Sequence, residues 1–247
     1  MPAKNLDAIT VVLPTRNEAR NIEHFLRSLP FGVHLLVVDA SEDDTAERLE
    51  HLRPSRTTVI RRRGSISGAR QLAVEQARTD WLLFTDADIV FPEGYFHRLL
   101  EQSEADAIYG PQLSRGRFRH YYWWFAFGQY VLQICGIPAA SGSNLLVKRQ
   151  AVLKAGGFDP DLGCNEDSEL VWRIRRHGGH VRFAPCLAVH VHDHRRLESG
   201  LLRKMLHSVM RCVLLYWDLI PARWRRSDWG YGPTLRRAEE DSPARGE

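Results

Sequence analysis

Two aspartates, Asp86 and Asp88, directly follow the apolar run Trp81–Thr85. Alternate residues of an extended segment point the same way, so both carboxylates can face one point. Two neighbouring carboxylates repel each other, and burying them costs free energy unless a cation or strong hydrogen-bond donors compensate their charge. Magnesium and manganese ions bind through one or two carboxylates plus substrate phosphates. An Asp-x-Asp sequence is common by chance, but this one follows a predicted buried strand and therefore favours a divalent-metal site.

A second acidic pair, Glu166-Asp167, opens a predicted helix over Ser168–His177. Acidic residues in a first helical turn are stabilised by the helix dipole, which is a purely structural explanation. The functional alternative makes one of the pair a general base, which must lie within hydrogen-bond reach of the hydroxyl it deprotonates. The turn-rich segment 156–160 before the pair can bring it back over the edge of a sheet.

Three histidines alternate in the sequence His190-Val191-His192-Asp193-His194, so in a strand they share one face. No His-Glu-x-x-His or cysteine pattern accompanies them, which argues against zinc. A single histidine completing a magnesium or manganese site is the preferred interpretation, and a lone exposed histidine is the alternative.

Polar residues also follow two earlier apolar runs. Pro14-Thr15-Arg16-Asn17-Glu18 comes after the first run, and a segment from Asp39 to Thr45 comes after the second. Ligands of open parallel sheets bind outside the carboxyl ends of the strands, where such loops converge. Each loop alone has a structural explanation, because Glu18 suits the start of a helix and Ser41 or Asp43 could be an N-cap.

The elements that must position these residues are clearest in the first hundred residues. Strands are predicted for the near-continuous apolar runs Ala8–Leu13, Val33–Val38, Thr57–Ile60 and Trp81–Thr85, each buried on both faces. Helical patterns with apolar residues at i, i+3, i+4 and i+7 lie between them. This alternation predicts an α/β fold with a mostly parallel central sheet and helices on both faces.

The second half is less regular. Residues 107–110, 144–147, 181–184 and 188–191 are further candidate strands, and an apolar stripe over 202–217 predicts an amphipathic helix. We therefore expect a main domain over residues 1–200, a C-terminal helix and basic, aromatic segment over 201–235, and a disordered polar tail over 236–247.

Composition sets broad limits. The chain has 247 residues, 44% hydrophobic and 26% charged, with a net charge of +4. This mild basic excess suits nucleotide diphosphates or an acidic membrane surface, but is too diffuse to argue for nucleic acid. The four widely spaced cysteines form no CxxC pair, and reduced thiols of a cytoplasmic protein are the expectation.

Together, the segments Val11–Ile22, Val37–Thr45, Gly68–Asp88 and Ser141–Arg175 resemble family 2 inverting glycosyltransferases, whose fold is the Rossmann-like GT-A fold. Their order and spacing match over roughly residues 8 to 195. The resemblance implies a nucleotide-sugar donor and a divalent metal, Mn²⁺ or Mg²⁺. The positions that match the family's nucleotide pocket are Pro14, Thr15, Glu18 and Asp39, with Arg70 near the phosphates.

The resemblance also implies roles for the acidic pairs. Asp88 matches the direct metal ligand, Asp86 approaches the ribose beside the metal, and Asp167 of the Glu166-Asp167 pair matches the catalytic base. His192 best matches the histidine that often completes the metal site, with His190 one register away. Two departures are Ala40-Ser41, where the family often has Gly and Ser after an additional Asp, and Gln71, where Asn is frequent.

The implied mechanism is direct displacement with inversion, in which Asp167 takes the proton of an acceptor. Two alternatives remain. A sugar-phosphate nucleotidyltransferase usually has a Gly-rich loop after its first strand, and Pro14–Glu18 contains no glycine. A non-catalytic nucleotide-sugar-binding protein is disfavoured because the acidic residues are intact.

The acceptor is unidentified, and a lipid-linked acceptor is one alternative. Residues 121–147 contain no charged residue and begin Tyr-Tyr-Trp-Trp-Phe. Two interpretations are open: a buried helix plus loop, which is slightly favoured, and an apolar surface that binds the acceptor. Basic and aromatic residues of the 201–235 segment favour peripheral contact with the inner face of the cell membrane.

Overall fold

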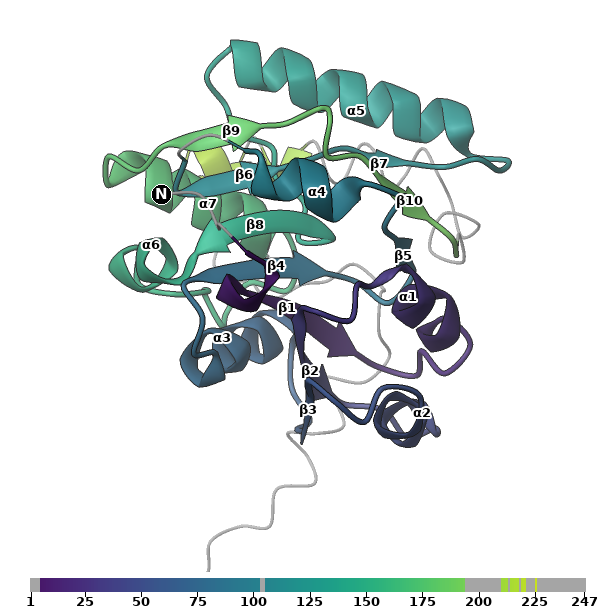
Figure 1. The fold of residues 1–247 in the computed structure, drawn as a ribbon. Coiled ribbons are helices and arrows are strands. Elements are labelled where there is room, and N and C mark those ends of the chain that lie inside the picture. The colour runs from purple at the N-terminus through teal and green to yellow at the C-terminus, as the bar shows by residue number, and fades with distance from the viewer. Residues whose placement is uncertain are drawn as a thin grey trace, which may run out of the picture.

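The computed structural model describes residues 5–102, 105–193, 210–212, 214–217, 219–220 and 225. A seven-stranded sheet in the order β3-β2-β1-β4-β8-β6-β9 forms its centre (Figure 1). Its strands are β1 (Ile9–Thr15), β2 (His34–Asp39), β3 (Thr57–Arg61), β4 (Trp81–Thr85), β6 (Ala107–Tyr109), β8 (Asn144–Lys148) and β9 (Val181–Phe183). Only β8 runs antiparallel to its neighbours in this sheet. The predicted α/β fold with a mostly parallel sheet is confirmed.

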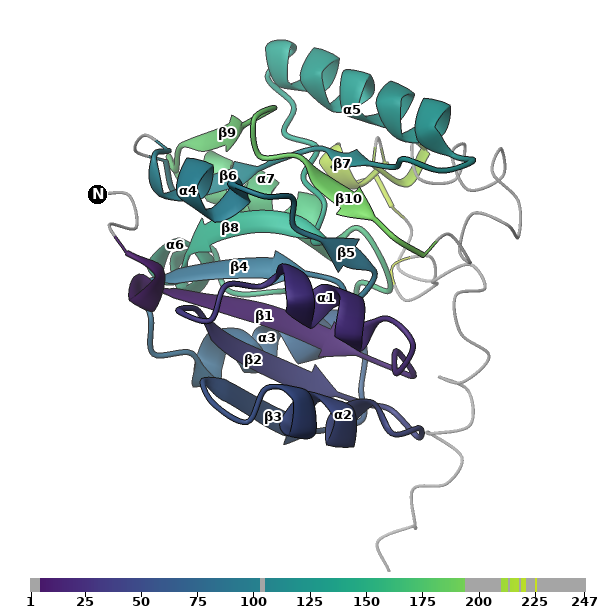
Figure 2. The ribbon, with the colours of Figure 1, turned by 45° about the vertical axis from the view of Figure 1, so that its right-hand side comes forward.

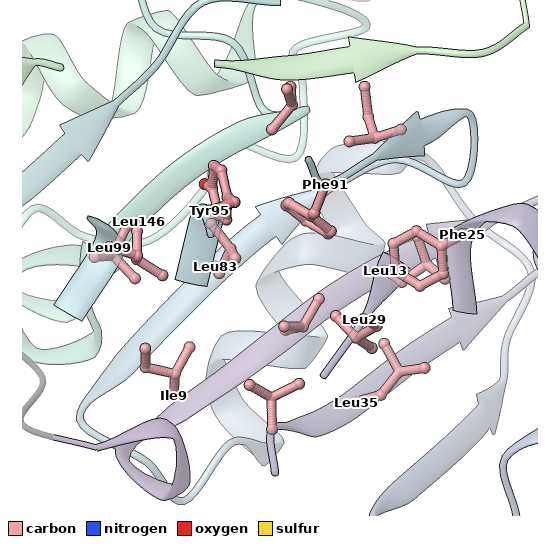
Figure 3. Packing of buried hydrophobic residues seen from close by; sticks show 14 of the residues in the cluster. Ile9, Leu13, Phe25, Leu29, Leu35, Leu83, Phe91, Tyr95, Leu99 and Leu146 are labelled. Carbon is pink, nitrogen blue, oxygen red and sulfur yellow. The ribbon is translucent and has the colours of Figure 1, made fainter. Parts of the chain in front are cut away.

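Helices cover both faces of this sheet (Figures 1 and 2). One face carries α1 (Ile22–Ser28), α2 (Thr45–Leu52) and α4 (Tyr95–Leu100), which contribute to one apolar cluster. Part of that cluster is drawn in Figure 3, where Phe25, Leu29 and Tyr95 lie over the strand residues Leu13, Leu35 and Leu83. The other face carries α3 (Ile66–Gln76), α6 (Arg149–Lys154) and α7 (Glu166–Arg176), which contribute to a second cluster.

A smaller sheet joins two distant segments of the chain. It has the order β5-β10-β7, with β5 (Ile89–Val90), β10 (Val189–Val191) and β7 (Gln112–Leu113). The antiparallel pairing of β5 and β10 places the residues after β10 beside the loop that carries Asp88. Two-residue strands such as β5 and β7 have no period that a sequence pattern could reveal.

The structure corrects two expectations. Strand β3 is the edge of the large sheet and is only partly buried, so the prediction that it is buried on both faces is wrong. The first half of the uncharged segment 121–147 lies in α5 (Arg119–Ile134). The preference for a buried helix is also wrong, because most of the large apolar side chains of α5 are exposed. Figure 2 shows α5 lying outside the main layers.

The predicted C-terminal segments fall largely outside the described residues. Within 201–235, residues 210–212 and 214–216 are helical, whereas the tail over 236–247 is not described. Among the described residues, no helix is both long enough and apolar enough to span a membrane.

Candidate active site at the carboxyl ends of the strands

The first strands deliver their polar residues to one edge of the sheet, as predicted. Strands β1 and β2 are paired in parallel, with Thr15 opposite Asp39 at their carboxyl ends. The hydroxyls of Thr15 and Ser41 both donate to Oδ1 of Asp39, at 2.7 and 2.6 Å. Because Asp39 is buried and held by two donors to one oxygen, its carboxylate has a fixed orientation.

The loop after β1 is tied to the loop after β2. Asn17 has a left-handed backbone (φ 56°), which asparagine tolerates better than most residues. Its N–H donates to the Ser41 hydroxyl at 2.8 Å, and its side-chain oxygen accepts the N–H of Glu42 at 2.8 Å. Ser41 is therefore a loop-to-loop contact rather than the helix cap considered from the sequence, whereas Asp43 accepts the Thr45 N–H at 3.1 Å and does act at the helix start.

A hollow of about 200 Å³ lies at the end of β2. Its lining combines acidic and hydroxyl groups of Asp39, Ser41 and Asp43 with Arg62 and Arg63 from the segment after β3. Polar and cationic linings of this kind suit an anionic, hydrogen-bonding ligand. Pro14 lies near the carboxyl end of β1, and Glu18 lies in the loop that follows, where its N–H donates to the Thr45 hydroxyl at 3.0 Å.

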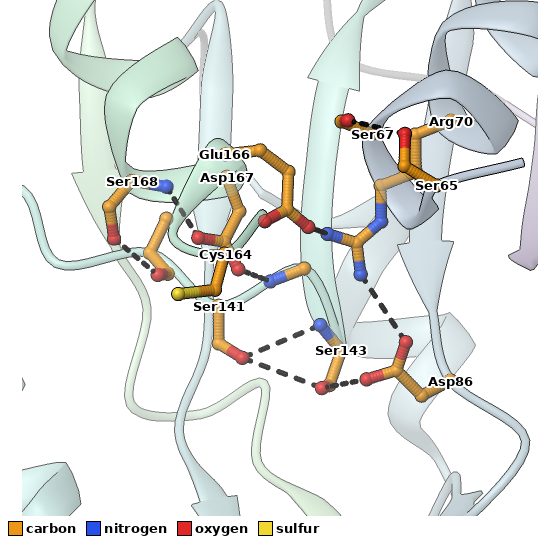
Figure 4. A network of polar contacts seen from close by, with 12 residues as sticks. Ser65, Ser67, Arg70, Asp86, Ser141, Ser143, Cys164, Glu166, Asp167 and Ser168 are labelled. Carbon is orange, nitrogen blue, oxygen red and sulfur yellow. Dashed lines mark hydrogen bonds and ion pairs between the residues drawn. The ribbon is translucent and has the colours of Figure 1, made fainter. Parts of the chain in front are cut away.

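Arg70 connects acidic residues from the two halves of the chain (Figure 4). Arg70 is 2% exposed, and its guanidinium forms an ion pair with Glu166 and lies 3.3 Å from Oδ1 of Asp86. Helix α3 presents Arg70 in its second turn, and Ser65 caps that helix by accepting the Gly68 N–H at 3.1 Å. The described contacts of Arg70 go to carboxylates, so the phosphate contact expected from the sequence stays a prediction.

The short loop Ser141-Gly142-Ser143 makes a second connection, which the sequence analysis did not assign (Figure 4). The Gly142 N–H donates to Oδ2 of Asp167, and the Ser143 hydroxyl donates to Oδ2 of Asp86. A Cβ on Gly142 would lie 2.2 Å from the Arg70 guanidinium, so only glycine fits here without a shift. The Ser-Gly-Ser triplet directly before a strand was the available sequence signal.

Glu166 and Asp167 open α7, two residues earlier than the predicted start of that helix. The preceding Asn165 has a left-handed backbone (φ 64°) that turns the chain into the helix. Glu166 is 4% exposed, whereas Asp167 is only partly buried. Of the two carboxylates, Asp167 is therefore the one that a second substrate can reach.

Both carboxyl groups have raised pKa values. Burial is the main cause for Glu166, and although Arg70 opposes it, the nearby Asp167 adds to the rise, which brings the pKa to about 7. Burial also raises the pKa of Asp167, against the lowering effects of Arg70 and of the N–H groups of Gly142 and Ser168. Because the two groups influence each other, they titrate as a pair that holds a proton more tightly than ordinary carboxyls do.

The residue after β10 lies beside Asp88. The His192 N–H donates to the Asp88 carbonyl at 2.7 Å, and the exposed His192 ring lies 4.3 Å from that of His24. His190 lies two residues earlier, in β10 between Val189 and Val191. Because both valines are buried in the core, His190 points to the opposite side of the strand from them. Of the three histidines, His192 is therefore the one whose backbone directly adjoins Asp88, and His194 is outside the described residues.

The described residues offer few side chains for a metal ion. Among the residues that the structure describes, no three His, Cys, Asp or Glu side chains form a cluster able to hold a metal alone. Both oxygens of Asp86 are engaged, by Arg70 and Ser143, and the role of Asp88 as the direct ligand stays a prediction. Magnesium and manganese commonly take only one or two protein carboxylates and complete their shell with substrate phosphates.

The comparisons with known proteins identify the class. The model of glycosyl transferase family 2 matches residues 10–154, and the chain belongs to this family. The pre-mycofactocin glycosyltransferase of Mycobacterium tuberculosis is 24% identical over 216 residues, covering 81% of this chain and 46% of that protein. The succinoglycan biosynthesis protein ExoA of Rhizobium meliloti is 27% identical over 192 residues, covering 68% and 58%. The chain thus spans about half the length of these relatives.

Solved structures confirm the GT-A fold. The mannosyltransferase PcManGT from Pyrobaculum calidifontis, in complex with GDP-Man and Mn²⁺, has a TM-score of 0.60 and 21% identity, covering 89% of this chain and 72% of that one. The S. aureus TarS 1–349 structure, in complex with UDP-GlcNAc, has a TM-score of 0.62 and 15% identity, covering 94% and 77%.

Proposed function

We propose that this chain transfers a sugar from a nucleotide-diphosphate donor to an acceptor hydroxyl, with a divalent cation and with inversion at the anomeric carbon. One observation carries the proposal: Asp86 from the first half of the chain is joined to the Glu166-Asp167 pair from the second. Arg70 contacts both Asp86 and Glu166, while the Ser143 hydroxyl donates to Asp86 and the neighbouring Gly142 N–H donates to Asp167. Structural neighbours in complex with GDP-Man and with UDP-GlcNAc support nucleotide diphosphate sugars as the donor class.

The donor side would use residues at the carboxyl ends of β1 and β2 and in the loops that follow them. The fixed Asp39 carboxylate and the adjoining hollow offer hydrogen-bond acceptors for a base or ribose, and Pro14, Thr15 and Glu18 form the neighbouring wall. Arg62 and Arg63 add positive charge next to that hollow. Asp86, held by Arg70 and Ser143, would accept from the ribose rather than bind the cation directly.

Asp88 and His192 would hold the cation. The donor set, one carboxylate and one imidazole on adjoining backbone segments, suits Mn²⁺ or Mg²⁺ with the remaining positions filled by diphosphate oxygens. When bound, the cation supplies positive charge that offsets the charge developing on the diphosphate.

Asp167 would act as the general base. It accepts the proton of the acceptor hydroxyl while that oxygen bonds to the anomeric carbon, and the bond from this carbon to the donor phosphate oxygen breaks with its electron pair. Glu166 keeps Arg70 in place and is too buried to meet the acceptor. A raised pKa strengthens Asp167 as a base at neutral pH, provided that the group is ionised there.

Release of nucleoside diphosphate from a panel of nucleotide sugars with Mn²⁺ tests the proposal. We expect slow release from at least one donor, abolished by EDTA and by Asp88→Ala. An NMR determination of the product's anomeric configuration should show inversion. A chain that binds a donor, as seen by a thermal shift, but releases nothing under any condition would be a nucleotide-sugar-binding protein instead.

A further inference from the structure

Helix α5 has its polarity reversed relative to an ordinary surface helix. Its inward side includes Tyr122 and two glutamines, Gln129 and Gln133. Gln129 donates to the Ala139 carbonyl at 2.7 Å, and Gln133 accepts from the Tyr109 hydroxyl at 2.9 Å. A helix on the surface of a soluble protein usually buries apolar residues and exposes polar ones, so the outer side of α5 needs a separate explanation.

The outward side forms a continuous apolar surface, which we call the aromatic face. Its residues recur at helical spacing and are between 40% and 68% exposed: Trp123, Trp124, Phe127, Tyr130, Val131 and Ile134. The Trp123 and Phe127 rings are stacked with centroids 5.9 Å apart, and Trp124 meets Trp123 edge-on at 4.8 Å. A contiguous exposed patch of this kind marks an interaction site.

Positive charge gathers at one end of the aromatic face. Arg115, Arg117, Arg119 and His120 are all exposed in and just before the first turn of α5. No Asp or Glu occurs anywhere from residue 107 to residue 158. Arginines at a helix N-terminus oppose the helix dipole, so this cluster is best compensated by negative charge from outside the segment.

The length of α5 limits how it can meet a membrane. The sixteen residues of α5 span about 24 Å at 1.5 Å per residue. A helix needs roughly 20 apolar residues to cross a bilayer, so α5 is too short to do so. Tryptophan and tyrosine are enriched at the membrane–water interface, where an apolar ring and a polar group meet different surroundings.

We propose that α5 lies in the plane of an anionic lipid bilayer, with the aromatic face inserted and the arginines 115, 117 and 119 on the phosphate groups. The charge pattern favours a bilayer over a second copy of the chain, because two α5 segments would meet with no acidic partner for either cluster. Such helices bind through buried apolar area plus attraction to anionic lipids.

This docking orients the candidate active site. Strand β7 precedes α5, and the loop with Ser141 follows α5. The two are linked because the Gln112 side chain of β7 donates to the Ser141 hydroxyl. The same loop contacts Asp86 and Asp167 through Gly142 and Ser143. The segments on both sides of α5 therefore meet at the site, so its acceptor side lies near the lipid surface. The docking itself does not depend on the proposed transfer reaction.

Vesicle co-sedimentation of the full chain tests the proposal. Phosphatidylcholine vesicles with phosphatidylglycerol should bind the wild type more strongly than phosphatidylcholine alone, and salt should weaken the difference. The triple variant Trp123→Ser, Trp124→Ser and Phe127→Ser should lower the partition coefficient by about a hundredfold or more. Replacing arginines 115, 117 and 119 by glutamine should remove most of the preference for anionic vesicles.

Matched controls come from exposed residues outside α5 and the segment before it. The exposed apolar residues Phe31 and Leu52 replaced by serine, and the exposed Arg27, Arg48 and Arg78 replaced by glutamine, should leave vesicle binding unchanged. The conservative variant Trp123→Phe with Trp124→Phe should still bind, but should lose fluorescence quenching by brominated lipids. Melting temperatures confirm that each variant is folded.

Three results would overturn the proposal. One is a wild type that stays in the supernatant with both vesicle types. Another is a triple variant that is folded and binds vesicles as well as the wild type, which would transfer the contact to another segment. The third is a triple variant that changes only the oligomeric state in solution, which would make the aromatic face an interface between copies of the chain.

Discussion

The two halves of the chain bring carboxylates to one site by different means. In the first half, Asp39 and Asp86 stand at the ends of parallel strands, so the sheet brings them to one edge and neighbouring side chains then orient their carboxylates. In the second half, Glu166 and Asp167 stand at the start of a helix and are held by side chains and N–H groups from distant segments. The first pair is therefore placed by the sheet, and the second pair depends on Arg70 and the Gly142 loop.

Because of this difference, we expect substitutions near the two groups to have different effects. A change near Asp39 acts on a local group of side chains, because the strand beneath it is fixed by ladder hydrogen bonds. A change near Glu166 or Asp167 acts on a buried charge network, in which removing one partner leaves another charge uncompensated. The predictions below test whether the halves differ in this way.

The largest expected effect is on catalysis by the second group. Asp167→Asn keeps the size of the side chain and one of the two oxygens that accept from Gly142 and Ser168, but it cannot take a proton, so kcat should fall by about 10² to 10⁴. Steady-state kinetics with the donor found in the screen measures it. Asp161→Asn, at an exposed acid six residues earlier, is the control, and an equal loss there would remove the special role of Asp167.

The largest expected effect on stability is at the buried bridge, by which we mean the ion pairs of Arg70 with Glu166 and Asp86. Arg70→Met leaves Glu166 and Asp86 without their cation and should lower the free energy of unfolding by about 3–5 kcal/mol, measured by urea denaturation. Adding Glu166→Gln should restore part of the loss. Arg48→Met breaks an exposed pair with Asp44 and should cost at most about 1 kcal/mol. Similar losses for both arginines would contradict the distinction between the two regions.

The raised pKa values predict a pH dependence with a definite sign. A base works only when ionised, so kcat/KM should rise about tenfold per pH unit up to the raised pKa of the pair and then level off. In the folded state Glu166 also keeps its proton at pH values where the unfolded state has released it. The stabilisation from this group is therefore fully present below the unfolded pKa of Glu166, and the free energy of unfolding falls as pH rises towards 7. Urea midpoints from pH 5 to 8 should show this fall, and Glu166→Gln should reduce it; a flat wild-type profile would contradict it.

Close packing beside the bridge gives the smallest of these effects. Gly142→Ala places a methyl group against the Arg70 guanidinium and should cost about 1–3 kcal/mol of stability together with some activity. Gly64→Ala adds a methyl group with nothing within 4 Å and should change stability by less than about 0.5 kcal/mol. Equal effects at the two glycines would show that the loop has room to move.

The contrast between the halves also explains what the sequence could predict. Strand β4 begins and ends as predicted, and β1, β2 and β3 are within two residues, because buried strands leave continuous apolar runs. Asp39 and Asp86 could be located from those runs alone. Strands β5 and β7 are too short for a pattern, and nothing local shows that Ser143 meets Asp86 across 57 residues.

The outward face of α5 could not be predicted from periodicity. An uncharged aromatic helix is compatible with burial in protein or in lipid, and only its surroundings decide between them. The sequence did indicate that this segment is unusual, because Arg119 and Lys148 are separated by a run without any charged residue. Its inward glutamines, Gln129 and Gln133, become informative only once their partners are known.

The central claim is that both halves serve one donor and cation site, and Mn²⁺-dependent thermal stabilisation by a nucleotide sugar tests it most directly. The wild type and Asp167→Asn should both gain melting temperature when donor and Mn²⁺ are added together, whereas Asp88→Asn should gain much less. An Asp88→Asn variant with the full Mn²⁺-dependent gain would contradict the account, because the cation would then be held elsewhere.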